Sequence, residues 1–528
     1  MKNSIKILFL LGLTGLFSCT GDFEEINTNP NSPEIAPSSA LLTYVQRVMS
    51  SKYGGVWYNM NEGSSMSGQI TKCAYIDESR YAYRSGTVND MFNQAYEYMF
   101  HLEKILLNEE GPDGNPNMTA IALILKCYIF QMLTDHLGAV PYSEAFKAEE
   151  GHIYPKYDSQ ESIYRDMLSV LKTASDMIDE NPPAFNRISG ADIIYGGNMT
   201  RWKKFANSLR LRMAVRMSYV DENGSKAVIN EILGNPSNYP LLSSIDDNAR
   251  FKWPGDANYR EPLSAAELNR HDYVICDIIV YVMDELNDPR LPAYAEEAEE
   301  GGGYKGFIAG AVSDVNSKEI SRIGRFFADN VAGYTVIFRY AEVEFLKAEI
   351  YERNLFNGDA EAAYNAGITA SIAEYASITP GTSVDQALVA PYLALPKVAY
   401  TNAALPVLAY AGNAANHNCI IPDGIVLNEC ANSTVKGNLK LQKIAYQKWL
   451  ALYQQGLEAW AEVRRTDIPV IGPAPGRIAK NHNRCPTRYP YPFDEESRNS
   501  ENLKAVNGGI VDYYWGQQMW WDKRTGIQ

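Results

Sequence analysis

Apolar residues recur at helical spacing in several separate segments of this chain, and this pattern limits the fold more than any other feature. In the clearest segment, 360–376, apolar and small side chains return every three or four residues on one face, which is the period of a helix packed along one side. Asp359 is placed to cap that helix. A preceding stripe of Val343, Leu346 and Ile350 supplies a facing helix. Together they predict a helical hairpin close to the ~34 residues of a tetratricopeptide unit.

Comparable helical segments recur along the chain. A single hairpin leaves an apolar face exposed, so several hairpins must stack to bury a common core. We therefore predict a mainly all-α fold, in which tetratricopeptide-like helical hairpins form a scaffold with long irregular loops and a few short β-hairpins, near 304–308 and 334–338. The further helical segments are 119–136, a helix behind a capping box of Asp158 and Glu161, 202–217 with a second stripe after the turn at 221–224, and the pair 441–453 and 457–465.

The amino terminus carries the pattern of an export signal. Lys2 and Lys6 precede an apolar run over 7–17 that leads to Cys19. This run is shorter than the ~20 residues that span a bilayer, and a small residue directly before a cysteine is typical of a bacterial lipoprotein cleavage site. We predict a signal peptide over 1–18, lipidation of Cys19, a lipidated tether over 19–36, and one helical domain over 37–528 with a loop insertion at about 235–338.

Charge and cysteine usage exclude several classes of protein. The net charge of −15, without any Lys/Arg-rich run, argues against nucleic acid as a partner. Cys127 lies in an apolar helical run and is expected to be a buried thiol, whereas Cys419 and Cys430 bracket a loop and form the best disulfide candidate. Cysteine and histidine spacing predicts no metal centre. No cofactor is predicted, although structural Ca²⁺ at the acidic stretch 296–300 or at Asp246 and Asp247 stays open.

Several motifs, taken in order behind Cys19, resemble one protein family. They are 22–31 (DFEEINTNPN), 135–145 (DHLGAVPYSEA), 202–216 (WKKFANSLRLRMAVR), 286–292 (LNDPRLP), 339–346 (RYAEVEFL) and 488–492 (RYPYP). Together they resemble the SusD/RagB family of nutrient-binding outer-membrane lipoproteins, in its SusD-like branch. Most of these residues are expected to be structural: Gly138 as a helix C-cap, and Arg210, Arg212 and Arg216 as partners of acidic neighbours.

The resemblance implies a function as well as a fold. Such proteins have tetratricopeptide-like helical pairs, are lipid-anchored on the exterior of the outer membrane, and cover a SusC-like TonB-dependent barrel. By that resemblance the chain binds a nutrient, first of all an oligosaccharide or polysaccharide, and delivers it to the barrel for import. The alternative ligand is a peptide.

Enzymatic function is not predicted. The chain has no G-x-S-x-G, H-E-x-x-H, P-loop or dinucleotide motif. A surface-anchored glycoside hydrolase stays as an alternative, because abundant carboxylates can form a catalytic pair that only their spatial separation reveals. A protein-interaction scaffold is a third alternative, which the long loops disfavour.

Candidate ligand contacts follow from the chemistry of sugars. A neutral sugar offers apolar C–H faces, on which aromatic rings stack, and hydroxyl groups, which amide or guanidinium groups bind. Aromatic residues in loops are therefore preferred over those on helix faces, while Trp515, Trp520 and Trp521 are expected to pack the carboxyl-terminal tail. The candidates are Trp57, Tyr58, Tyr75, Tyr81, Tyr83 and Arg84 in one region, and Trp253 and Tyr259 in the segment 251–261.

Overall fold

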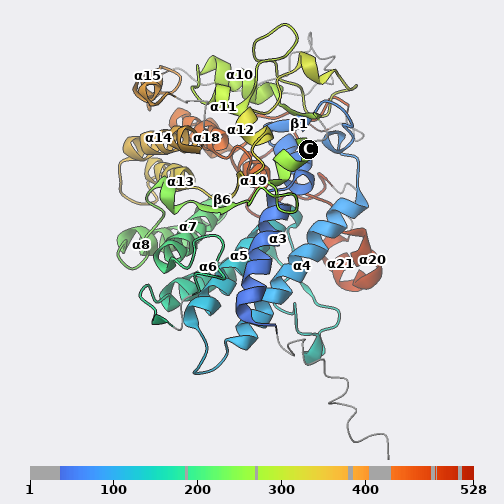
Figure 1. Cartoon of the computed structure of the whole chain (residues 1–528), viewed down its shortest axis with the longest axis vertical. Coiled ribbons are helices and arrows are strands. Elements are labelled where there is room, and N and C mark those ends of the chain that lie inside the picture. Colours follow the sequence, from blue (N-terminus) through green and yellow to red (C-terminus); the bar gives the residue numbers. More distant parts are fainter. Residues whose placement is uncertain are drawn as a thin grey trace, which may run out of the picture.

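The computed structural model describes residues 36–184, 188–267, 271–378, 385–403, 430–476, 482, 484–508 and 514–527. The predicted signal peptide, Cys19 and the tether up to residue 35 lie outside the described residues, as does Cys419. Helices dominate, with a few short antiparallel strand pairs (Figure 1). The prediction of a mainly helical fold with a few short strand pairs is confirmed.

Five long helices of the amino-terminal half pack successively against one another (Figure 1). They are α3 (Ser38–Tyr53), α4 (Ser85–Asn108), α5 (Pro116–Leu137), α6 (Gln160–Met177) and α7 (Met199–Met217). Helix α5 is buried on nearly all sides and ends at Gly138, whose φ of 82° makes it the predicted C-cap. In the described residues, α5 alone has the length and composition of a membrane span, but 83% of its apolar window is buried inside the protein.

The predicted capping box before α6 is wrong by one residue. The side chain of Ser159 accepts the hydrogen bond from the Ser162 backbone N–H at 3.2 Å, so Ser159 is the N-cap. The Asp158 carboxylate instead accepts hydrogen bonds from the backbone N–H groups of Tyr142 and Ser143 at 3.1 and 2.7 Å. These bonds fasten the turn that follows α5, where β2 (Val140–Pro141) pairs with β3 (Tyr157–Asp158).

Three helical pairs continue the scaffold, as predicted: α7 with α8 (Glu222–Gly234), α13 (Tyr340–Glu352) with α14 (Ala360–Ile378), and α18 (Leu439–Ala451) with α19 (Gly456–Thr466). Asp359 caps α14, accepting the Ala362 N–H at 2.9 Å. The predicted contact stripe on α13 is placed on the wrong side, because Leu346 and Ile350 pack toward α7 and α8. Phe345 instead meets α14, where Gly367 leaves room for its ring.

Each of these strands pairs with a partner far away in the sequence, whereas the sequence predicted local hairpins. Strand β6 (Tyr334–Phe338) lies at a predicted position but pairs with β4 (Ala249–Lys252), and β1 (Ile70–Lys72) pairs with β5 (Tyr273–Ile275). The hairpin expected at 304–308 is replaced by a single bridge between Phe307 and Cys276. The segment 235–338 also holds α9 (Pro262–Glu267), α10 (Asp277–Glu285), α11 (Leu291–Tyr294) and α12 (Arg325–Ala328), so it is less irregular than predicted.

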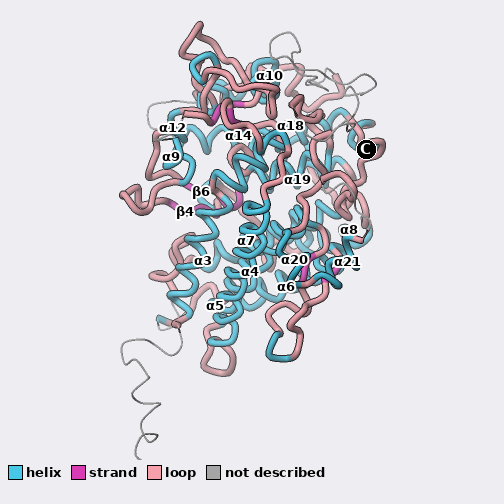
Figure 2. Tube along the Cα trace, turned by 90° about the vertical axis from the view of Figure 1, so that its right-hand side faces the viewer, coloured by secondary structure: helices cyan, strands magenta, loops and turns pink. Residues whose placement is uncertain are grey.

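Short elements complete the described chain, and loops gather at the end of the molecule near α10 (Figure 2). They are the 3₁₀ turns η2 (Glu78–Arg80), η3 (Ala148–Glu150), η5 (Ile245–Asp247), η6 (Ser317–Glu319) and η7 (Gln386–Leu388), the π-helix η1 (Val56–Ser64), and the helices α15 (Val389–Leu393), α17 (Ser433–Lys436), α20 (Phe493–Arg498) and α21 (Ser500–Asn507).

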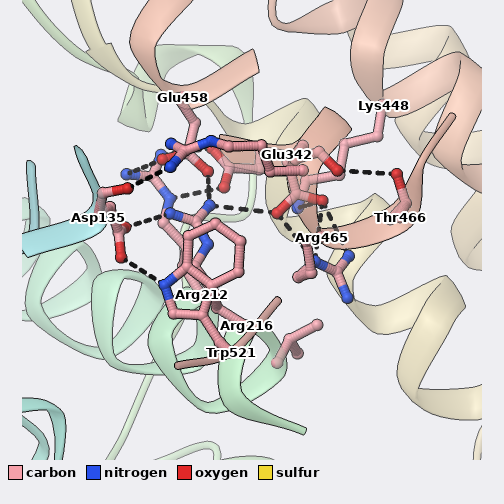
Figure 3. A network of polar contacts seen from close by, with 12 residues as sticks. Asp135, Arg212, Arg216, Glu342, Lys448, Glu458, Arg465, Thr466 and Trp521 are labelled. Carbon is pink, nitrogen blue, oxygen red and sulfur yellow. Dashed lines mark hydrogen bonds and ion pairs between the residues drawn. The ribbon is translucent and has the colours of Figure 1, made fainter. Parts of the chain in front are cut away.

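A buried network of charges joins the helical pairs (Figure 3). Arg212 of α7 binds Glu342 of α13 at 2.5 Å, and Arg216 binds Asp135 of α5 at 2.5 Å and also pairs with Glu458 of α19. Burial raises the pKa of Asp135, but Arg216 and the hydroxyl of Tyr164 outweigh this and hold it below its usual value. The prediction that Arg212 and Arg216 pair with acidic neighbours is confirmed, and Arg210 likewise pairs with Glu231.

The carboxyl-terminal tail packs onto the same region. The indole N–H of Trp521 donates to Asp135 at 2.9 Å, and Trp515 is buried as well, so both pack the tail as predicted, with Trp520 half-buried beside them. The 488–492 segment crosses the end of α5, where the Tyr489 N–H donates to the His136 carbonyl at 2.8 Å.

The cysteines and acidic residues are placed as follows. Cys127 is a buried free thiol, as predicted. Cys430 is also a buried free thiol, which donates to the Thr466 carbonyl at 3.2 Å, so its predicted disulfide with Cys419, a residue outside the described part of the chain, is wrong. Three of the six acidic residues considered for Ca²⁺ are engaged by cations, since Asp247 binds Lys204, Glu296 binds Arg325 and Glu299 binds Lys318 at 2.7–2.9 Å.

Candidate functional site

A cleft of about 750 Å³ opens where α3 ends and where η1 and α4 begin. Four of the predicted ligand contacts line it: Trp57, Tyr58, Tyr83 and Arg84. They come from two chain segments, since Trp57 and Tyr58 lie in the first turn of η1 and Tyr83 and Arg84 lead into α4. The structure thus joins two loop regions of the sequence in one hollow.

Close backbone packing holds η1 in place. A Cβ on Gly63 would lie 2.5 Å from the Leu457 nitrogen, and a Cβ on Gly456 would lie 2.3 Å from the Ser64 nitrogen, so only glycines allow η1 to approach α19 this closely. The Asn59 amide adds a hydrogen bond to the Gln454 carbonyl at 2.7 Å. Helices of the π type are rare and occur often at functional sites. Here the π-helix fixes the direction of Trp57 and Tyr58.

The aromatic residues of the cleft have different exposures. Trp57 is 51% and Tyr83 44% exposed, so both rings offer surface to a ligand. Tyr58 is buried apart from the part that lines the cleft, and its hydroxyl donates to Gln94 Oε1 at 3.0 Å. Burial, with the nearby Asp90 carboxylate, raises the pKa of Tyr58 well above its usual value, so this hydroxyl stays protonated as a donor. Trp57 and Tyr83 are therefore the available stacking surfaces.

Polar groups surround these rings. The Arg84 guanidinium binds Glu78 at 3.1 Å and reaches Asp77 at 3.9 Å, yet its side chain stays 41% exposed. Lys52 and Asp90 also line the cleft, and within the described part of the chain neither forms an ion pair. Ser51, Ser85 and Thr87 add hydroxyl groups. The cleft thus combines two exposed rings with hydrogen-bonding groups of both charge signs.

A buried carboxyl group lies behind the π-helix wall. Burial, together with the charge of Glu78, raises the pKa of Glu62 to about 8, although Arg84 opposes this effect. At neutral pH the Glu62 carboxyl is therefore predominantly protonated. This uncharged acid belongs to the same helix that directs Trp57 into the cleft.

Comparisons with known proteins agree on the family. A family model described as starch-binding and associating with the outer membrane, the SusD-like model, matches residues 30–492. The chain belongs to the SusD-like family. No curated protein matched this SusD-like chain.

Solved structures share the fold of this SusD-like protein. A chitin-binding protein is 23% identical with a TM-score of 0.73, the match covering 92% of this chain and 100% of that one. A SusD homologue from Bacteroides thetaiotaomicron is 22% identical with a TM-score of 0.74, over 93% of this chain and 100% of that one. A SusD homologue from Bacteroides uniformis is 25% identical with a TM-score of 0.72, over 92% and 99%.

Besides Tyr58, two predicted contacts of the SusD-like protein are buried, and these two do not line the cleft. Trp253 is only 3% exposed: side chains alternate along β4 and just beyond it, so Phe251 and Trp253 both point inward while Lys252 points out. The Trp253 indole N–H donates to Thr335 at 2.9 Å. Tyr81 packs edge-on against Trp515, and its hydroxyl accepts the Ala474 N–H at 2.9 Å. Their prediction as loop residues open to a ligand is wrong.

Two further candidates are exposed but lie outside the cleft. Tyr75 is 68% exposed and Tyr259 is 43% exposed, and neither lines the hollow between α3 and α4. Sequence reasoning missed Lys52, Asp90 and Pro262, which do line it. No local sequence signal identifies them. Lys52 lies near the end of α3, Asp90 near the start of α4 and Pro262 at the start of α9, and these three positions come together only in the folded chain.

Proposed function

We propose that this SusD-like protein captures a carbohydrate in the cleft. It holds the sugar without cleaving it and passes it to a SusC-like TonB-dependent barrel, while Cys19 anchors it to the exterior of the outer membrane. The observation that carries this proposal is the presence of two exposed rings, Trp57 and Tyr83, in one cleft of about 750 Å³. Clefts of this size suit small ligands and short segments of a polymer.

The chemistry of the cleft matches that of a sugar. An indole or phenol ring provides an apolar face for sugar C–H groups, and Arg84, already oriented by Glu78, points exposed N–H donors at hydroxyl groups. Lys52 and Asp90 place one charge of each sign at the cleft, which gives no strong preference for a charged ligand. The family description as starch-binding and the chitin-binding structural neighbour support a glycan over a peptide.

The carboxylates support binding without hydrolysis. Among the described residues that line the cleft, Asp90 is the single acid. Glycoside hydrolysis ordinarily needs two carboxyl groups facing the scissile bond. Asp77 and Glu78, which lie beside Arg84, are engaged with its guanidinium group. We therefore expect the bound glycan to be recovered intact.

Calorimetry with the soluble form, residues 20–528, tests the binding function. The panel contains soluble starch, chitin oligomers, other polysaccharides and peptides, and each sample is analysed afterwards for breakdown products. We expect saturable, salt-insensitive binding of one glycan class, a loss of about tenfold or more in Trp57→Ala and Tyr83→Ala, and no change in Tyr154→Ala, a matched exposed tyrosine outside the cleft. Peptide binding alone, or unchanged affinity in both cleft variants, would contradict the proposal.

Membrane fractionation tests the anchor and the partner. Cys19→Ala should release the full chain from membranes, because acyl chains supply the attachment. A variant that still sediments with membranes would overturn the anchor. In mild detergent the wild type should co-purify with an outer-membrane barrel, and recovery of the protein alone would favour a free-standing binder.

A further inference from the structure

Helices α3 and α4 lie side by side and run in opposite directions from the cleft to the end where the chain enters the domain (Figure 1). Lys52, near the end of α3, and Ser85, at the start of α4, line the cleft. The other end of the pair holds Ser38, the first residue of α3, and Asn108, the last residue of α4. Because α4 has 24 residues, the two ends lie about 36 Å apart.

Asn108 fixes the point at which the tether joins the domain. Its side-chain amide donates to the Ala36 carbonyl at 3.0 Å. Ala36 is the first described residue, and the tether before it, residues 19–35, lies outside the described residues. The tether therefore meets the domain beside the last turn of α4, at the end that faces away from the cleft.

Exposed apolar side chains occupy the last turns of α4. Phe100 is 46% and Leu107 is 58% exposed, and seven residues separate them, so they lie on one face of the helix. Lys104 lies between them, with its ammonium nitrogen 5.1 Å from the centre of the Phe100 ring. These three residues form the α4 stripe. On the same face nearer the cleft, Asn93 and Glu97 are polar and exposed, so the apolar part is confined to the end where the tether joins.

Lys104 supplies a positive charge at this end that is open to a partner, because it forms no ion pair with any described residue. The acids beside it are already engaged. Glu103 pairs with Lys126, and Glu109 accepts the backbone N–H of Asn115 at 2.8 Å. A segment that covers the α4 stripe should therefore combine apolar side chains with negative charge.

The end of the tether has this composition. Pro33, Glu34 and Ile35 place an acid between two apolar residues, and the tether over 20–35 contains four acids and no Lys or Arg. In an extended chain, Pro33 and Ile35 point to the same side. Three extended residues cover about 10 Å, which equals the rise of about 10 Å along a helix over seven residues. Starting from the Asn108 contact, the last residues of the tether thus have the length needed to cover the α4 stripe.

We propose that residues 32–35 dock along the α4 stripe, with their apolar side chains on its two apolar residues and the Glu34 carboxylate beside Lys104. Burial of the exposed apolar surface supplies the driving force. The docked segment shortens the link between Cys19 and the domain to residues 20–31 and holds the domain by its α3–α4 end. The cleft then opens at the opposite end of α4, whichever ligand it takes.

A Glu-specific protease tests the docked segment, because Glu25 and Glu34 are cleavage sites in the tether. The full chain in mild detergent is digested briefly, and mass spectrometry measures the released amino-terminal peptides. Phe100→Ser and Leu107→Ser should each accelerate cleavage after Glu34 about five- to tenfold, because the rate follows the population of the undocked state. Lys104→Glu should act in the same direction. Cleavage after Glu25 should keep its wild-type rate in all three variants.

Ile153→Ser is the matched control, because Ile153 is 68% exposed but lies in the loop before β3. It should be cleaved like the wild type. Equal cleavage after Glu34 in the wild type and in all stripe variants would overturn the docking, and so would a gain that is equally large after Glu25. The stripe variants should bind glycans like the wild type, so this failure would leave the carbohydrate function standing.

Two further measurements identify another occupant of the α4 stripe if the cleavage rates do not change. Binding of the Cys19→Ala chain to phosphatidylcholine vesicles, lost on adding Leu107→Ser, would assign the stripe to the membrane. A dimer in light scattering that Leu107→Ser converts to a monomer would assign it to a second copy of the chain. Either result would replace the docked tether.

Discussion

The charge network of the core and the ligand cleft use the same residue types for different purposes. Arg216 in the core is fully buried and meets Asp135, Glu458 and Glu462, whereas Arg84 in the cleft meets Glu78 and Asp77 but remains 41% exposed. The tryptophans differ in the same way. Trp521 is buried with its indole N–H on Asp135, and Trp57 is half exposed.

This difference shows how a cleft becomes available to a ligand. In the core every face of the guanidinium is surrounded by protein, so its interactions join α5, α7 and α19. In the cleft one carboxylate fixes the direction of Arg84 and leaves other N–H groups open. Substitutions in the two regions should therefore separate cleanly into effects on folding and effects on binding.

The largest expected effect is that of Arg216→Ala in the core. Removing the cation leaves the buried Asp135 carboxylate without its ion-pair partner and takes one of the cations from Glu458 and Glu462, which should lower the free energy of unfolding by about 3–5 kcal/mol. Urea denaturation followed by circular dichroism measures the change. Arg165→Ala is the matched control, because Arg165 also binds two carboxylates but at the surface, where a pair contributes about 0–1 kcal/mol. Equal losses in both variants would refute the assignment of Arg216 to the core network.

Trp253→Ala and Trp57→Ala sharpen the comparison between buried and exposed rings. Trp253 is packed edge-on against Phe251, so its truncation should cost about 3 kcal/mol of stability. Trp57→Ala should leave the free energy of unfolding within roughly 0.5 kcal/mol of the wild type and weaken sugar binding instead. Urea denaturation and calorimetry on the same two samples measure both effects. A Trp253→Ala protein that keeps its stability but loses affinity would reverse the roles assigned to the two rings.

The helices are the part of the fold that the sequence predicts well, because their signals are local. The segment 360–376 carries its own period and its own cap at Asp359, and the structure reproduces both. The strands fail for the opposite reason: 334–338 has strand character, but its partner β4 lies far back in the chain and no turn between them marks the pairing. The Asp158 cap fails because a tertiary contact to the turn after α5 competes for its carboxylate.

The cleft shows the same limit at the level of side chains. Trp57 and Tyr83 can be selected because they are aromatic residues in segments predicted to be loops, yet nothing in the sequence indicates that they share a hollow with Pro262. Trp253 meets the same criteria and is buried, because side-chain alternation past the end of β4 turns it inward. Loop position identifies candidates, and only the folded chain shows which of them face solvent together.

The smallest of these effects concerns pH and the π-helix that connects the two regions. The pKa of Glu62 is raised to about 8, first by burial and then by the charge of Glu78, against a usual value near 4.5. Between pH 4.5 and about 8 the folded state therefore holds a proton on Glu62 that the unfolded state has released. The stability that the neutral acid contributes is complete below pH 4.5 and is lost as the pH rises toward 8. Glu62→Gln keeps a neutral side chain at every pH. It should unfold like the wild type at about pH 4.5 and be more stable by on the order of 2 kcal/mol at about pH 8.

Urea titrations at both pH values measure the difference, with the exposed Glu361→Gln as the control for general charge removal. A Glu62→Gln variant whose advantage does not grow with pH would show that Glu62 is ionised in the fold. The π-helix wall of the cleft would then carry a buried negative charge beside Glu78, with Arg84 as the cation that opposes it.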